Sequence, residues 1–158
     1  MLLRAENRDD GTRFEKEAPG LNEDILGNFA SGILSERKVR EFVDNLDWSA
    51  DAKLLLMRAY DATIFVGKTV FKIGRFIVCS AIRLASTFPK TTFGIVAGAI
   101  LGSLVAGIPL IGFVLGPIAT PLAIILGTLW GALEDISDAA LRQEVKGEVK
   151  RFDSFRTA

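Results

Sequence analysis

The sequence of 158 residues contains no histidine and only one cysteine, Cys79. The absence of histidine excludes His-based acid–base catalysis, Ser-His and Cys-His nucleophile pairs and nearly all catalytic zinc sites. A single cysteine cannot form an intrachain disulfide, so a disulfide-stabilised scaffold is excluded as well. We therefore expect a protein that is not an enzyme and that holds neither a metal nor a cofactor.

Charge is absent from one long stretch of the chain. From Thr91 to Leu133 there are 43 residues without a charged side chain, although the whole sequence carries 19 basic and 19 acidic residues. Apolar content of this length is typical of membrane segments. The preceding residues, 53–90, carry seven basic side chains and one acidic one. Because basic residues flank the uncharged stretch on both sides and none lies inside it, we expect both termini on the cytoplasmic side of a membrane.

The pattern along the chain predicts an all-α, membrane-associated protein. Its expected segments are a loose polar leader (1–20), short acidic amphipathic helices (21–48), one long basic amphipathic helix (49–89), a glycine-rich hydrophobic transmembrane hairpin (91–133) and a polar C-terminal helix and tail (134–158). Asn22, Ser35 and Ser49 stand where the N-caps of the first three helices are expected.

The predicted long helix has its charges on one side. At 100° per residue they fall within an arc of about 140° that includes Lys68, Lys72, Arg75 and Arg83. In a membrane protein such a basic arc is predicted to face lipid phosphates or a water-filled lumen. The alternative is a surface helix that covers the core of a soluble protein. The spacing of Gly67 and Gly74 places both on another line of this helix, which indicates close packing against a second helix.

The uncharged stretch is predicted to form a helical hairpin. Its first arm runs from Phe93 to Ile108 and stops at Pro109, residues 110–120 form a partly irregular tip, and the second arm starts at Pro121. We expect this arm to continue into the C-terminal helix without a break. The alternative is a hairpin that is buried as the core of a soluble helical protein, but a hairpin that is apolar all round needs cover on every side.

Glycine recurs along the hairpin at a spacing that favours helix packing. Gly94, Gly98 and Gly102 form a glycine zipper, and Gly112 and Gly116 add a second pair. In a bilayer, helices associate through such faces because small residues let the backbones approach closely. The pattern indicates contact between the two arms of one hairpin or between copies of the chain in a homo-oligomer.

Three further features of the sequence bear on phosphate binding, thiol reactivity and nucleic-acid binding. Residues 62–69 match a relaxed phosphate-binding loop, A-x4-G-K-T, but they lie inside the helical pattern, without the strand and glycine-rich turn that cradle phosphates. Cys79 lies on the basic arc, where cations would lower the pKa of its thiol, or it is only a small helix residue. The arc lacks aromatic residues on which bases stack, so no nucleic acid is expected as a partner.

The order of amphipathic helices, uncharged hairpin and polar helix is similar to that of colicin-type pore-forming domains, in arrangement and without a shared residue motif. The leading hypothesis is a small membrane protein that self-assembles through the zipper into a homo-oligomer and perturbs the bilayer or forms a pore. The alternative is a non-conducting anchor or scaffold that recruits a protein partner through its acidic N-terminal helices or its C-terminal helix. A pore would place the basic arc on a lumen, and an anchor would place it on lipid.

Overall fold

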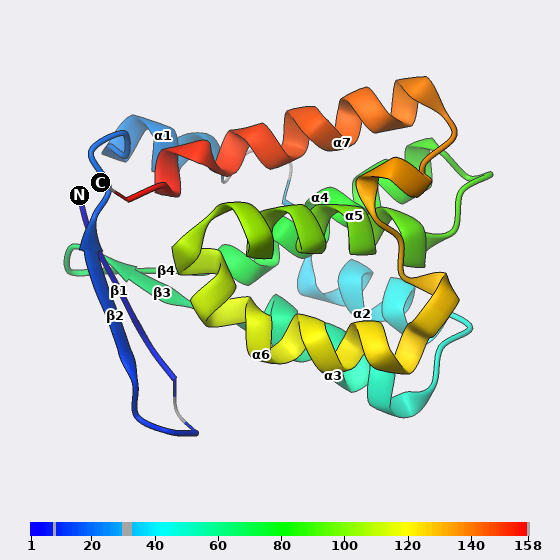
Figure 1. Cartoon of the computed structure of the whole chain (residues 1–158), viewed down its shortest axis with the longest axis horizontal. Coiled ribbons are helices and arrows are strands. Elements are labelled where there is room, and N and C mark those ends of the chain that lie inside the picture. The colour runs from blue at the N-terminus through cyan, green and yellow to red at the C-terminus, as the bar shows by residue number, and fades with distance from the viewer. Residues whose placement is uncertain (8, 30–32, 158) are drawn as a thin grey trace.

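Figure 1 shows the fold as a computed structural model, which describes residues 1–7, 9–29 and 33–157. The helices are α1 (Glu23–Phe29), α2 (Glu36–Asp44), α3 (Ala50–Tyr60), α4 (Ile73–Thr87), α5 (Phe93–Gly107), α6 (Pro109–Leu126) and α7 (Ala139–Arg151), with the short 3-10 turns η1 (Gly127–Leu129), η2 (Leu133–Asp135) and η3 (Phe152–Phe155). The strands are β1 (Leu2–Glu6), β2 (Arg13–Glu17), β3 (Ile64–Val66) and β4 (Thr69–Phe71).

Four of the helices form a ring. Helix α3 contacts α4 and α6, and α5 closes the ring by contacting the same two helices. Helix α7 packs across α4 and α5, α2 contacts α4, and β1 contacts α6. The described residues are therefore mostly helical, as predicted, but the class is not all-α because they also form an antiparallel sheet.

The sheet has the strand order β2-β1-β3-β4. Its first two strands form an antiparallel hairpin, and Leu3 of β1 pairs with Val66 of β3. Leu3 and Ala5 are buried while their neighbours along β1 are exposed, which is the alternation of a half-buried strand. Gly11 adopts a positive φ of 73° in the connection between β1 and β2. The segment predicted as a loose leader (1–20) instead forms this hairpin.

The first three helices begin at the predicted caps. The side-chain oxygens of Asn22, Ser35 and Ser49 each accept a hydrogen bond from the backbone N–H three residues later, at 2.9, 3.2 and 3.2 Å. Each cap satisfies one of the N–H groups that the first helical turn leaves without a partner. The caps therefore fix where α1, α2 and α3 begin.

The prediction of one long helix over 49–89 is wrong. Helix α3 ends at Tyr60, the β3–β4 hairpin follows, and α4 begins at Ile73. Gly67 makes the turn with a φ of 60°, which side-chain-bearing residues rarely adopt. Most residues of β3 and β4 are β-branched or aromatic, and such residues favour strands. Helices α3 and α4 consequently form a second helical hairpin that packs on α5 and α6.

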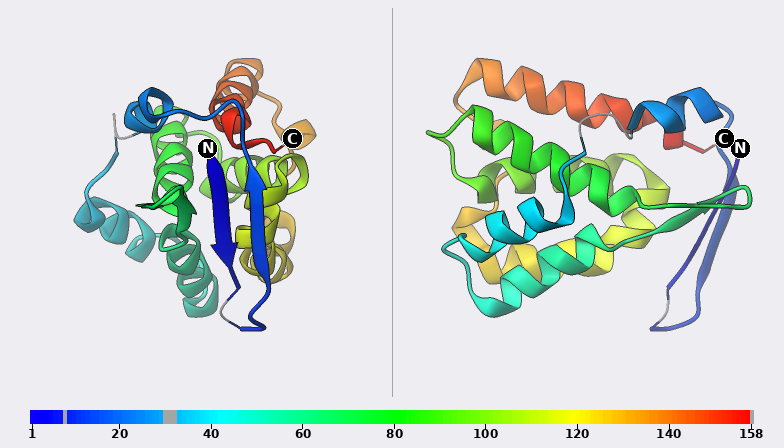
Figure 2. Two further views of the ribbon diagram at one scale, coloured as in Figure 1. Left: turned by 90° about the vertical axis from the view of Figure 1, so that its left-hand side faces the viewer. Right: turned by 180° about the vertical axis from the view of Figure 1, so that it is seen from behind.

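The uncharged stretch does form two helices, with α5 in the interior. Helix α5 contacts α4, α6 and α7; Figure 1 shows it between α6 and α7, and the right-hand view of Figure 2 shows α4 on the other side. Ile108 alone separates α5 from α6. The predicted irregular tip over 110–120 is wrong because this segment is helical, with Pro109 in its first turn and Pro117 and Pro121 inside α6.

The second arm does not continue into the C-terminal helix. Helix α6 ends at Leu126, Gly127 adopts a φ of 55°, and the 3-10 turns η1 and η2 follow. Helix α7 begins only after Asp138, whose Oδ1 accepts hydrogen bonds from the N–H groups of Ala140 and Leu141. The break lets α7 fold back over α4 and α5.

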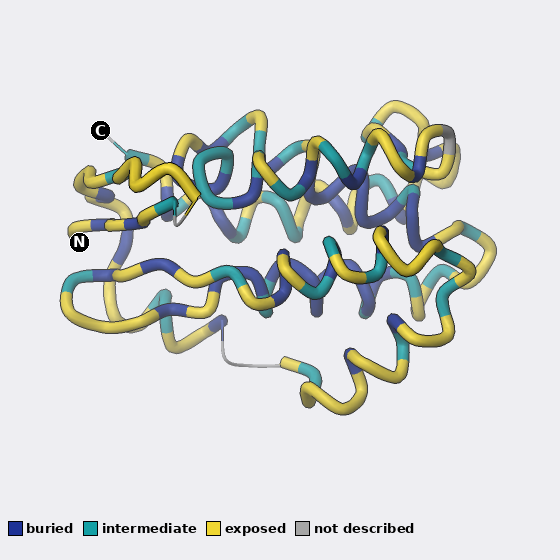
Figure 3. Tube along the Cα trace, turned by 90° about the horizontal axis from the view of Figure 1, so that it is seen from below, coloured by how far each residue is buried: buried dark blue, intermediate teal, exposed yellow. Residues whose placement is uncertain are grey.

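Figure 3 shows that the helices are buried on one side and exposed on the other. Within the core, a cluster of phenylalanine side chains joins distant parts of the chain. The cluster consists of Phe29, Phe71, Phe76, Phe152 and Phe155. The ring centroids of Phe29 and Phe152 are 5.0 Å apart, and those of Phe71 and Phe155 are 5.5 Å apart. Helix α1, β4, α4 and the end of α7 are thus joined in one core.

Candidate functional site

Several large apolar side chains lie on the outside of the bundle at the C-terminal end of α6. The exposed fractions are 76% for Ile124 and 44% for Ile125 on α6, and 46% for Leu129 on η1. We call these three side chains the outer α6 face. A surface helix of a soluble bundle normally carries charged side chains on its outer side, whereas α6 carries none along its 18 residues.

The opposite side of α6 is firmly packed. Leu122 and Leu126 are buried together with Ala52 of α3, and Trp48 and Trp130 pack on this cluster. The inward side chains therefore hold α6 in place, while Ile124 and Ile125 on its outer side remain exposed. Among the described residues, α6 is the one helix with the length and composition of a membrane span, with a mean hydropathy of 2.1 and only 33% of its residues buried.

The basic residues that were predicted to share one arc lie in separate places. Lys68 and Lys72 flank the edge strand β4 and are exposed, where charge discourages strand pairing between molecules. The Arg75 guanidinium lies 5.3 Å from the ring centroid of Tyr60. Arg83 forms an ion pair with a carboxylate of α7. Lys68 and Lys72 thus belong to the β3–β4 hairpin and its exit, whereas Arg75 and Arg83 both lie on α4 and interact with side chains of α3 and α7.

The first two glycines of the predicted zipper pack inside the chain. A Cβ atom on Gly98 would lie 2.6 Å from both the backbone N and O of Gly131. A Cβ on Gly94 would collide with the carbonyl oxygen of Leu129. At both positions the backbone of α5 packs directly against the backbone of the segment after α6. Glycine is required there because a side chain would occupy the space of that segment.

The remaining predicted glycines divide into two groups. A Cβ on Gly112 would lie 2.7 Å from the carbonyl oxygen of Val105, so α5 and α6 meet closely there, and a Cβ on Gly74 would collide with the carbonyl of Ala59 in α3. No atom lies within 4 Å of the corresponding position at Gly67, Gly102 or Gly116. Only these last positions leave backbone open for another molecule.

A polar network between α4 and α7 was not predicted. The carboxylate of Glu148 accepts a hydrogen bond from Ser80 Oγ at 2.9 Å and forms ion pairs with Arg151 at 2.8 Å and Arg83 at 3.6 Å. Ser80 is buried, and so is Arg83 Nε, for which the described residues offer no hydrogen-bond partner. The network fixes α7 over α4. Glu148 and Ser80 are 68 residues apart, so no local spacing in the sequence indicates it.

The described residues were searched for the side-chain groups that hold a metal ion. They contain no group of three His, Cys, Asp or Glu side chains that could hold a metal ion. Burial raises the pKa of the Cys79 thiol, although Arg83 and Arg75 act to lower it, which favours the interpretation of Cys79 as a small helix residue over that of an activated thiol. Residues 62–69 form a strand, a turn and the start of a second strand, without the helix that completes a phosphate-binding loop.

No known protein family, curated protein or solved structure matches this chain.

Proposed function

We propose that the protein is a membrane-bound scaffold that holds to the bilayer through the outer α6 face. The single observation that carries the proposal is an uncharged helix of 18 residues with only 33% of its residues buried. Full burial of one isoleucine contributes about 1.5–3 kcal/mol. Ile124, Ile125 and Leu129 together therefore supply apolar surface for binding at a lipid interface.

The folded bundle supports an anchor better than a pore. Helix α5 is covered by α4, α6 and α7, and its first two zipper glycines are used inside the chain. Of the cations that a lumen needs, Lys68 and Lys72 flank strand β4, and Arg75 and Arg83 interact with Tyr60 and Glu148 within the chain. An anchor needs only the outer α6 face in the membrane and leaves the other helices folded.

The polar helices would then face the cytoplasm and recruit a protein partner. Helix α2 exposes its charges, but Glu36 pairs with Arg40 at 3.0 Å and Glu41 with Arg37 at 3.2 Å, so the helix offers a mixed rather than an acidic face. Helix α7 is exposed along its outer side. We propose these two helices as the partner-binding surfaces of the scaffold, with both termini on the cytoplasmic side.

A second function, a pore-forming homo-oligomer, is supported by helix length. At about 1.5 Å per residue, α6 extends about 27 Å, close to the hydrocarbon thickness of about 30 Å. Helix α5 has 15 residues and extends only about 22 Å. This function would also require α5 to leave α4 and α7.

Flotation with lipid vesicles tests the scaffold. We expect the wild-type chain to float with the vesicles. The double substitution Ile124→Glu, Ile125→Glu should lower the apparent affinity by at least about tenfold, because two apolar side chains that enter the lipid become charged. Vesicles that contain a trapped dye should not leak. Dye release by the wild-type chain would instead support the pore.

Val70→Glu is the matched control, because Val70 is 53% exposed and lies on β4 rather than on the bundle surface near α6. This variant should float like the wild type. If the wild-type chain stays in the soluble fraction with every lipid mixture, the scaffold proposal fails.

A further inference from the structure

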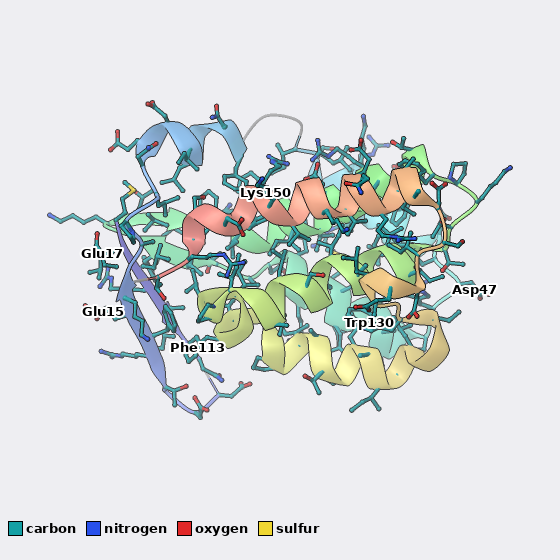
Figure 4. All side chains as sticks on the ribbon, turned by 45° about the horizontal axis from the view of Figure 1, so that its top comes forward. Glu15, Glu17, Asp47, Phe113, Trp130 and Lys150 are labelled. Carbon is teal, nitrogen blue, oxygen red and sulfur yellow. The ribbon has the colours of Figure 1, made fainter. Side chains whose placement is uncertain are left out.

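The chain segments at the C-terminal end of α6 carry mainly acidic side chains. Ala52 of α3 is buried with Leu122 and Leu126 of α6, so the first turn of α3 and the connection before it lie beside this end of α6. Figure 4 shows Asp47 of that connection at the same end of the bundle. The segment that follows Leu129 of the outer α6 face leads from there to η2.

These segments, 45–53 and 127–138, hold five carboxylates, those of Asp47, Asp51, Glu134, Asp135 and Asp138. We call these five side chains the acidic end. All five are exposed, and the ion pairs of the described residues involve none of them. The same segments hold one base, Lys53, whose Nζ donates to the carbonyl oxygen of Asp44 at 2.9 Å. Lys90, in the α4–α5 connection, adds one more.

The two lysines that flank β4 lie at the other end of the molecule. Lys68 and Lys72 are exposed there, and Figure 1 shows the sheet at the end of the bundle opposite the C-terminal end of α6. The whole chain has a net charge of zero. The sign of the charge that a membrane meets therefore depends on which end of the bundle approaches it.

We infer that the outer α6 face binds a membrane surface of zwitterionic lipid and that anionic lipid weakens this binding. The inference rests on the proposed scaffold and adds the class of lipid. The negative potential of an anionic surface attracts basic groups, and the same field repels the carboxylates of the acidic end. Burial of Ile124, Ile125 and Leu129 needs no charge on the lipid. A zwitterionic surface therefore keeps the attraction without the repulsion.

Flotation of the full chain with two kinds of vesicle tests the inference. One kind is pure phosphatidylcholine, and the other contains about one third phosphatidylserine, which is anionic. At low salt the wild type should bind the neutral vesicles at least about fivefold more tightly. The difference should disappear at about 1 M salt, because the Debye length falls to about 3 Å.

Neutralisation of three carboxylates tests whether the acidic end causes the preference. The variant Asp47→Asn, Glu134→Gln, Asp135→Asn should bind both kinds of vesicle about equally, because much of the repulsion is removed. Asparagine at position 135 keeps an oxygen that can accept from the N–H of Ala132, as Asp135 does. Circular dichroism verifies that the variant is folded, and the salt dependence of the wild type tests the inference independently of it.

The matched control removes three negative charges elsewhere, through Glu15→Gln, Glu17→Gln and Asp24→Asn. These residues lie on β2 and α1, and Figure 4 shows Glu15 and Glu17 at the end of the bundle away from Asp47. The control should keep the fivefold preference for neutral vesicles, since the charge at the acidic end is unchanged.

Four results would overturn the inference. Tighter binding of the wild type to the anionic vesicles would do so and would indicate contact through Lys68 and Lys72 at the sheet end. Equal binding at low salt, an unchanged preference in the variant of the acidic end, or a lost preference in the control would also contradict it. Binding to neither kind of vesicle would instead refute the scaffold itself, and the lipid preference with it.

Discussion

Replacing Phe152 with alanine is expected to lower the free energy of unfolding by about 4 kcal/mol. Phe152 is fully buried, and its ring centroid lies 5.0 Å from that of Phe29 and 6.3 Å from that of Phe155. Its removal leaves a cavity where α1, α7 and η3 meet and also removes the aromatic contacts. Urea denaturation followed by circular dichroism measures the change.

Phe65→Ala serves as the control, because the same side-chain truncation takes place at a strand position that is 43% exposed. Its effect should be about 1 kcal/mol or less. Equal losses for the two variants would mean that the phenylalanine cluster does not hold the chain ends to the bundle.

The second large effect is expected at the zipper. Gly98→Ala should lower the free energy of unfolding by about 2 kcal/mol, since the added carbon would lie 2.6 Å from the backbone of Gly131 and forces it to move. Gly102→Ala should raise it by up to about 1 kcal/mol, since its Cβ meets no atom and alanine favours the helix.

Thermal denaturation of the two variants side by side gives the comparison. They lie one turn apart on α5 and make the same chemical change. If both variants shift the midpoint in the same direction and by the same amount, Gly98 does not pack against the segment after α6.

The helix starts were predictable because they depend on local chemistry. Asn22, Ser35 and Ser49 cap the first three helices through hydrogen bonds to nearby N–H groups. Pro109 likewise marks a helix boundary. It begins α6 rather than a tip, because proline is as well suited to start a helix as to end one.

The strands were not predicted because the apolar residues of these segments also fit a helical period. Residues 64–71 fit a helical wheel, yet their β-branched residues and Gly67 favour a hairpin. In the N-terminal hairpin only Leu3 and Ala5 of β1 are buried, so the alternation is short. Asp10-Gly11 was the available turn signal.

The candidate surfaces were only partly visible in the sequence. The uncharged composition of α6 was evident, but which of its sides stays outside depends on contacts with α3 and α5. The zipper spacing likewise did not distinguish Gly98, which is packed within the chain, from Gly102, which is open.

The most direct test of the scaffold measures the environment of position 124 in the presence of membranes. Cys79 is the only cysteine of the sequence and is buried, so Cys79→Ala with Ile124→Cys gives a single site for an environment-sensitive fluorophore. The same label at Gln143→Cys, on the exposed side of α7, is the control. On addition of vesicles, the emission at position 124 should shift to shorter wavelength while that at position 143 stays unchanged. An unchanged spectrum at position 124 with every lipid mixture would contradict membrane binding through α6.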